Sequence, residues 1–131
     1  MRFLVFYRKF CESKKFRVFI TRPDMPDIGI KILREKCDLT IWKSPIPIPR
    51  KDFLTSIRGM NALFVTIKEK IDGEVLDAAG PQLKVVATIS VGHDHLDVAE
   101  CRKRGIRVAN TPELLTDATA ELTVSYLHDD E

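Results

Sequence analysis

From residue 17 onward, two patterns of hydrophobic and polar positions alternate along the chain. Short β-branched apolar runs predict strands, whereas apolar residues spaced three or four apart predict helices. The five expected strands cover residues 17–21, 38–42, 62–66, 85–90 and 106–109. Helices are expected between the strands, and a last helix should begin near Thr116 or Asp117. Strands that alternate with helices predict βαβ units in a mostly parallel sheet.

Turn and capping residues mark where these helices begin and end. The first helix should have Pro26 near its first turn and bury apolar residues at Ile28, Ile32 and Leu33. Asp72 and Asp97 are expected to cap later helices. The predicted fold is therefore α/β and flavodoxin-like. It is a parallel five-stranded sheet in the order 2-1-3-4-5, with helices on both faces and the functional site at the carboxyl ends of the strands.

Length and charge limit the classes of protein that fit this pattern. A chain of 131 residues predicts one domain and is too short for separate cofactor and substrate domains. The net charge is +2, but residues 1–16 hold most of the excess, in Arg2, Arg8, Lys9, Lys14 and Lys15 against Glu12. The mildly acidic remainder argues against a nucleic acid or an anionic membrane as partner. No apolar run has the length of a membrane span.

Residues 1–16 are treated as a basic leader or extension, residues 17–127 as the folded domain and residues 128–131 as an acidic tail. Three widely spaced cysteines without a CxxC pair favour a reducing compartment, so cytoplasmic localisation is expected. The alternative is mitochondrial localisation, if residues 1–16 are a transit peptide.

The spacing of the glycines excludes two common nucleotide-binding motifs. No two of the six have GxG spacing, so neither the dinucleotide fingerprint nor a phosphate-binding loop is present. His93 and His95 form an HxH pair, but their acidic neighbours do not complete a ligand set and Asp97 is better placed as a helix cap. No metal site is expected.

Two strand-to-helix connections hold the candidate chemistry. In residues 88–97, Gly92 leaves a buried strand for a capped helix, and the amides of Val91 and Gly92 can bind a carboxylate there. The alternative is that Gly92 only makes the turn and its amides bond to water. In residues 110–122, helix capping accounts for Thr116 or Asp117 and leaves the Thr119 hydroxyl for a ligand.

These segments resemble the D-isomer-specific 2-hydroxyacid dehydrogenases, in particular the glyoxylate reductase/hydroxypyruvate reductase branch. The resemblance rests on LKVVATISVGHDHLDVAECRKRGIRVANTPELLTDATAEL at 83–122 and on ALFVTIKEKIDGEVLDAAGPQLK at 62–84. It implies an NADH- or NADPH-dependent oxidoreductase that interconverts small 2-keto and 2-hydroxy acids, of which this chain is the substrate domain. It also implies that Ser90, Val91 and Gly92 hold the substrate carboxylate, that Thr66 and Ile67 line the substrate cleft, and that Thr119 lies near the cofactor.

The same resemblance implies what these 131 residues do not contain. The family's Rossmann cofactor domain follows the helix in which this chain stops, so that helix is expected to be a truncated interdomain helix. The catalytic arginine, glutamate and histidine of the family have no counterpart here, and neither does most of its dimer interface. We therefore expect that this chain is not catalytically competent alone and does not bind NAD or NADP tightly. The alternative is a non-enzymatic module that binds a carboxylate or a partner protein.

Overall fold

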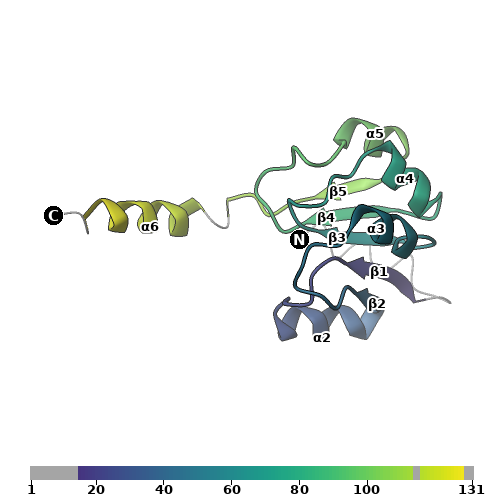
Figure 1. Cartoon of the computed structure of the whole chain (residues 1–131), viewed down its shortest axis with the longest axis horizontal. Coiled ribbons are helices and arrows are strands. Elements are labelled where there is room, and N and C mark those ends of the chain that lie inside the picture. The colour runs from purple at the N-terminus through teal and green to yellow at the C-terminus, as the bar shows by residue number, and fades with distance from the viewer. Residues whose placement is uncertain (1–14, 114–115, 129–131) are drawn as a thin grey trace.

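Five strands, each followed by a helix, make up the part of the chain that the structure describes, residues 15–113 and 116–128 of a computed structural model (Figure 1). The strands are β1 (Phe16–Ile20), β2 (Cys37–Ile41), β3 (Ala62–Val65), β4 (Val85–Thr88) and β5 (Arg107–Ala109). The helices are α2 (Asp27–Lys36), α3 (Arg50–Ser56), α4 (Gly73–Ala79), α5 (Val98–Lys103) and α6 (Thr116–His128).

The strands form one parallel sheet in the order β2-β1-β3-β4-β5. Val18 of β1 pairs with Leu39 on one side and with Ala62 on the other, so β1 lies between β2 and β3. Because the chain steps outward from β1 to one edge and then from β3 to the other, the order reverses beside β1. The flavodoxin-like topology predicted from the sequence is confirmed.

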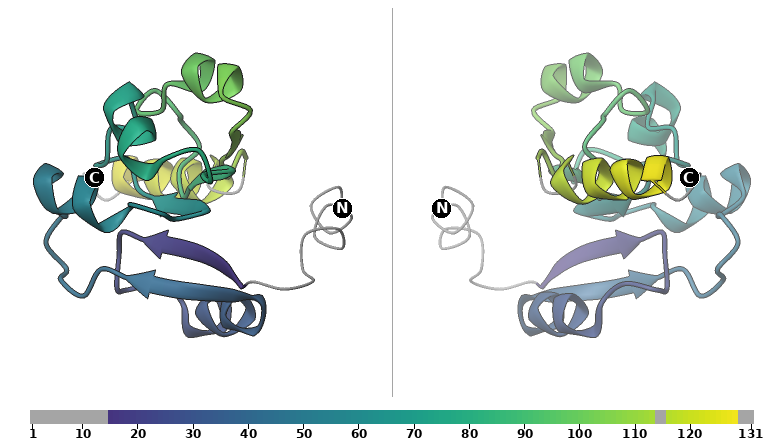
Figure 2. Two further views of the ribbon diagram at one scale, coloured as in Figure 1. Left: turned by 90° about the vertical axis from the view of Figure 1, so that its right-hand side faces the viewer. Right: turned by 90° about the vertical axis from the view of Figure 1, so that its left-hand side faces the viewer.

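Helices lie on both faces of the sheet (Figures 1 and 2), with α3, α4 and α5 on one face and α2 on the other. The larger core packs Phe53 of α3, Leu76 of α4 and Cys101 of α5 against Leu63 and Val86 of the sheet. The smaller core packs α2 on the opposite face, and its residues include Val18, Ile20, Ile30, Leu33 and Phe64. The first face therefore holds most of the buried apolar surface, which is the main source of stability.

Local signals set the ends of two helices as predicted. The Asp72 carboxylate accepts a hydrogen bond from the Val75 amide at 3.3 Å, and the Asp97 carboxylate accepts one from the Glu100 amide at 2.9 Å. Helix α4 ends at Gly80, whose φ of +93° is a conformation that L side chains rarely adopt. The capping box expected at Asp97 is only half formed, because the Glu100 carboxylate pairs with Arg104 instead.

Two predicted apolar positions are not in the core. Ile28 and Ile32 of α2 are 67% and 57% exposed, so the expectation that they are buried is wrong. Helix α2 instead packs through Ile30 and Leu33, which lie three residues apart on one side of the helix. Among the described residues α2 is the only helix on its face, which leaves Val85 and Ala87 of β4 half-buried.

Helix α6 projects away from the sheet and the other helices (Figure 1). Its Leu122 and Val124 side chains are exposed. The expected leader and tail fall mostly on residues 1–14 and 129–131, outside the described residues, although Phe16 already belongs to β1 and His128 closes α6. In the described part of the chain, no helix combines the length and the apolar character needed to cross a membrane.

Candidate functional site

The carboxyl edge of the sheet brings together the predicted turn after β4 and the segment that follows β5. Strands β4 and β5 pair in parallel, with Ala87 beside Ala109, so Ser90 and Asn110 leave the sheet at the same edge. Asn110 then bonds back to the turn, since its side-chain amide donates to the Val91 carbonyl at 2.8 Å. The turn is thereby attached to the neighbouring strand as well as to its own.

All three carbonyl groups of the Ser90–Gly92 turn accept hydrogen bonds from the protein. The Ser90 carbonyl accepts from the Thr111 amide at 3.0 Å, and the Val91 carbonyl accepts from Asn110. The Gly92 carbonyl accepts from the Ser90 hydroxyl at 2.7 Å. Each carbonyl therefore has a fixed direction.

The amide groups of the same turn have no such partners. Within residues 15–113 and 116–128, no hydrogen bond reaches the main-chain N–H of Val91, Gly92 or His93. In a trans peptide the N–H points away from the carbonyl of the preceding residue, so each fixed carbonyl directs the next N–H to the other side. Successive N–H groups exposed in this way form a site for an anion such as a carboxylate.

The fold itself does not require glycine at position 92. The φ of Gly92 is not among the positive values, and a Cβ built there would have no atom within 4 Å. A backbone conformation that only glycine adopts easily therefore does not explain Gly92. A ligand that approaches the main chain closely is a physical reason for glycine that remains.

The loop after β3 contributes a buried carboxylate beside this turn. Oε2 of Glu69, which is 6% exposed, accepts from the Thr66 amide and hydroxyl, both at 2.8 Å, and from the Thr21 hydroxyl at 3.0 Å. Both hydrogen-bond donors of Thr66, its amide and its hydroxyl, therefore bond to Glu69. The Ile67 side chain, in contrast, is 66% exposed. Of the two predicted cleft residues, Ile67 is the one free to contact a ligand through its side chain.

His95 lies between the two loops. Its carbonyl accepts from the Ile71 amide at 2.8 Å, and its Nε2 lies 3.0 Å from the Thr88 hydroxyl. Burial lowers the pKa of His95 below its usual value, although the carboxylates of Glu69 and Asp94 oppose this shift. His95 is therefore held by local hydrogen bonds, and its lowered pKa favours the neutral imidazole. Among the described residues, no three histidine, cysteine or acidic side chains gather to hold a metal ion.

Thr119 reaches the same side of the molecule as Val91. Both line a shallow open depression of about 560 Å³, between the turn and α6. Thr116, Ala120, Thr123 and Val124 of α6 complete its lining. The structure thus places the predicted cofactor-side residue and the predicted carboxylate-binding turn next to one depression.

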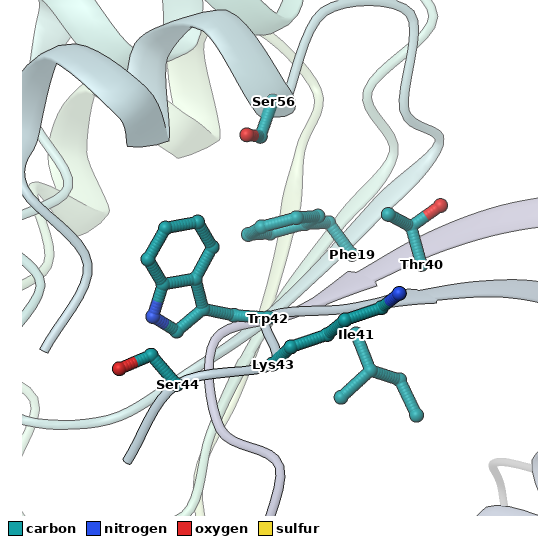
Figure 3. A pocket seen from close by; sticks show the side chains of 7 residues that line it. All are labelled: Phe19, Thr40, Ile41, Trp42, Lys43, Ser44 and Ser56. Carbon is teal, nitrogen blue, oxygen red and sulfur yellow. The ribbon is translucent and has the colours of Figure 1, made fainter. Parts of the chain in front are cut away.

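A second cavity, of about 400 Å³, lies at the carboxyl end of the edge strand β2. Figure 3 shows the rings of Phe19 and Trp42 facing this opening, with Ser56 on its other side. Its lining is largely apolar, and the Trp42 indole N–H already donates to the Ile46 carbonyl at 3.0 Å. None of the predicted site residues lies there.

Asn110, His95 and Glu69 act on the site, but the sequence interpretation gave them no role in it. A usable signal existed for Asn110, because it follows β5 just as Ser90 follows β4, and neighbouring parallel strands end at the same edge. For Glu69 and His95 the contacts depend on how two loops meet, at the pairing of Ile71 with Leu96. The spacing of residues within either loop does not predict that pairing.

A parallel sheet in this order, with open amides at its carboxyl edge, defines a flavodoxin-like α/β domain with a candidate anion-binding turn. Residues 18–126 match the model of the D-isomer specific 2-hydroxyacid dehydrogenase catalytic domain. The chain belongs to this family.

Individual relatives agree with this assignment. The chain is 45% identical over 117 residues to the glyoxylate reductase/hydroxypyruvate reductase of Mus musculus, which covers 88% of this chain and 35% of the relative. A crystal structure of a Thermus thermophilus protein is 40% identical with a TM-score of 0.79, over 86% of this chain and 35% of that one. An NADPH-dependent glyoxylate/hydroxypyruvate reductase from Sinorhizobium meliloti, solved with NADP and malonate, is 26% identical with a TM-score of 0.65, over 87% and 34% of the two chains. The chain spans about a third of the length of the relatives it matches.

Proposed function

We propose that these residues are the substrate domain of an NAD(P)H-dependent oxidoreductase that reduces small 2-keto acids, such as glyoxylate and hydroxypyruvate, to 2-hydroxy acids. The observation that carries the proposal is the turn whose carbonyls are bonded and whose amides are open. The names of the relatives support the substrate class, and the malonate in the Sinorhizobium meliloti structure is itself a carboxylate ligand.

In this proposal the described residues bind and orient the substrate. The amides of Val91 and Gly92 donate to its carboxylate, and Asn110 keeps the peptide between them in a fixed direction. Ile67, whose side chain is exposed in the loop after β3, provides an apolar contact to the substrate. Holding the carboxylate fixes where the keto carbon lies, which is the contribution of positioning to the rate.

The nicotinamide cofactor supplies the hydride, but the residues present do not build a site for it. Thr119 lines the depression, yet no two glycines in the 131 residues have the GxG spacing that lets a main chain approach a pyrophosphate. No histidine here stands in the family's proton-donor context either. We therefore propose that these 131 residues bind the substrate carboxylate but do not catalyse the reduction by themselves.

The test is titration of the ¹⁵N-labelled chain with glyoxylate, followed in the amide spectrum. We expect the Val91 and Gly92 signals to shift and saturate at millimolar glyoxylate. Gly92→Ala should keep the fold, because its Cβ meets no atom, but weaken binding about five-fold or more by filling the space beside the amides. Gly29→Ala in α2 is the matched control, since its Cβ also meets no atom and it lies away from the turn. Shifts spread evenly over the surface, or equal affinities for the two variants, would contradict the proposal.

Helix α6 favours a second function, the binding of a partner protein. Leu122 and Val124 are 57% and 52% exposed on a helix that projects from the domain (Figure 1). Sedimentation of the chain mixed with a full-length member of the family tests this function. A complex that Leu122→Lys abolishes would support it, and two independent species would exclude it.

A further inference from the structure

The hydrogen bonds that run from His95 to the turn have a single possible direction, and the role that this direction gives His95 rests on the proposed function. Four groups lie in a row: His95 Nε2, the Thr88 hydroxyl, the Ser90 hydroxyl and the Gly92 carbonyl. The three distances along this row are 3.0, 2.8 and 2.7 Å. Thr88 and Ser90 are both buried, so water does not replace these contacts easily.

The chemistry at one end of the row fixes every donor in it. A carbonyl oxygen only accepts, so the single Ser90 hydroxyl proton is directed at Gly92. The Ser90 oxygen must then accept from Thr88, which uses the single Thr88 hydroxyl proton. The Thr88 oxygen in turn accepts from His95, so Nε2 of His95 carries the proton. Neutral His95 is therefore the Nε2–H tautomer.

The far end of the row determines where a third amide points. The Gly92 carbonyl and the His93 N–H belong to one trans peptide and point in opposite directions. Because the Ser90 hydroxyl holds the carbonyl inward, the His93 N–H is directed outward, and no described residue accepts from it. The row therefore sets the direction of a donor next to the amides of Val91 and Gly92.

The position of His95 itself is set by the other loop. Its carbonyl accepts from the Ile71 amide, and the neighbouring Leu96 is buried and pairs with Ile71. The loop after β3 therefore holds the main chain of His95, while the His95 imidazole donates to Thr88 at the end of β4. This arrangement gives the half-buried His95 a defined structural role.

We propose that His95 is a positioning residue of the carboxylate-binding turn, which acts through Thr88 and Ser90 to make the His93 main-chain N–H a third donor to the substrate carboxylate. Loss of the His95 proton donor frees Thr88 to turn its hydroxyl away from Ser90. The Gly92–His93 peptide then loses its fixed direction. The side chain of His93 takes no part, since it is exposed.

The experiment compares the whole chain with His95→Phe, which removes the donor, and with His95→Gln, which keeps an N–H at a similar reach. Imidazole ¹⁵N shifts of the unliganded protein should show the Nε2–H tautomer. On addition of glyoxylate, the His93 amide should shift together with those of Val91 and Gly92. His95→Phe should abolish the His93 response and weaken binding about five-fold, and His95→Gln should restore most of both.

Ser90→Ala breaks the same row without touching the imidazole, so it should reproduce His95→Phe. Thr55→Val is the control, because it removes a side-chain hydrogen bond to Lys51 on α3, away from the turn. An Nδ1–H tautomer, or a His95→Phe variant that binds glyoxylate like the wild type, overturns the inference while Val91 and Gly92 still respond. If none of the three amides responds in the wild type, the proposed function fails and the third donor fails with it.

Discussion

Replacement of Glu69 by alanine tests whether the buried carboxylate holds the loop that forms one side of the site. Glu69 is 6% exposed, and its Oε2 accepts from three donors, one on Thr21 directly after β1 and two on Thr66 in the loop itself. Glu69→Ala removes that acceptor without adding volume. We expect the protein to lose stability and the segment from Thr66 to Lys70 to lose its fixed conformation.

The magnitude follows from what each donor can do afterwards. The Thr21 hydroxyl can rotate toward the Phe64 carbonyl, which lies 3.5 Å away, and the Thr66 hydroxyl can also rotate. The Thr66 amide cannot, because its direction belongs to the backbone. A buried donor without a partner costs about 1–3 kcal/mol, and a hydrogen bond to a charged group contributes about 1.5–3 kcal/mol. We therefore expect a loss of about 2–4 kcal/mol, a large share of the roughly 5–15 kcal/mol typical of a domain.

Urea unfolding followed by the fluorescence of Trp42, the single tryptophan, measures this loss. With an m-value of roughly 1–2 kcal/mol per molar, the midpoint should fall by about 1–4 M. Glu69→Gln keeps one oxygen acceptor, so its urea midpoint should lie between that of the wild type and that of Glu69→Ala. The matched control is Glu74→Ala, because that side chain is 65% exposed and its pair with Arg50 lies at the surface, where it contributes at most about 1 kcal/mol. A Glu69→Ala midpoint equal to that of the Glu74→Ala control would refute the reasoning.

Three further predictions concern the core, the turn and the titration of His95. Leu63→Ala, at a position 1% exposed in the sheet, should cost about 2–5 kcal/mol in the same urea assay, and a loss below 1 kcal/mol would mean that the core is looser than the structure shows. Asn110→Ala should leave stability within about 1 kcal/mol of the wild type but raise the dissociation constant for glyoxylate about five-fold, as measured by amide titration. The lowered pKa of His95 means that the unfolded chain binds its proton first as the pH falls below about 6.5, so stability should decrease from pH 7 toward pH 5. His95→Gln should flatten this part of the pH profile, and an unchanged slope would show that other groups cause it.

The order of the strands could be predicted from the sequence because each strand and helix has its own local signal. The apolar run at 62–65 forms a strand, Asp72 caps the start of α4 and Gly80 follows its end. Each of these signals can be recognised from one residue or a few consecutive ones. The handedness of βαβ units then leaves few ways to arrange five such strands. Local patterns and one general rule were sufficient for the topology.

The faces of the helices were harder to predict. Four isoleucine and leucine positions in α2 fit a helical period, and the sequence does not say which stripe meets the sheet. In the structure Ile30 and Leu33 are partly buried against the sheet, whereas Ile28 and Ile32 are exposed. Tertiary contact, not periodicity, decides this choice.

The candidate site, like the helix faces, could be predicted only in part from local sequence patterns. The open amides of Val91 and Gly92 follow from a glycine turn after a buried strand, which the sequence displays. The directions of these two amides depend on Thr111 and Asn110, which belong to the connection after β5 and not to the turn itself. The partners of a carbonyl group leave no spacing pattern, so the residues that orient the turn had to be found in the structure.

In the proposed function, main-chain and side-chain groups have different roles in recognising a substrate. Main-chain amides donate to any carboxylate, so in the proposed function the turn recognises carboxylates as a class and cannot distinguish one 2-keto acid from another. The side chains of Ser90 and Asn110 bond to carbonyl groups of the turn and so orient its amides, and we propose that His95 acts on them through Thr88. Discrimination between a small acid such as glyoxylate and a larger one such as hydroxypyruvate must then come from side chains that face the depression or its rim. Val91 lines the depression and the Ile67 side chain is exposed in the loop after β3, so we propose that the size of these two side chains, rather than the strength of the carboxylate contact, sets the substrate preference.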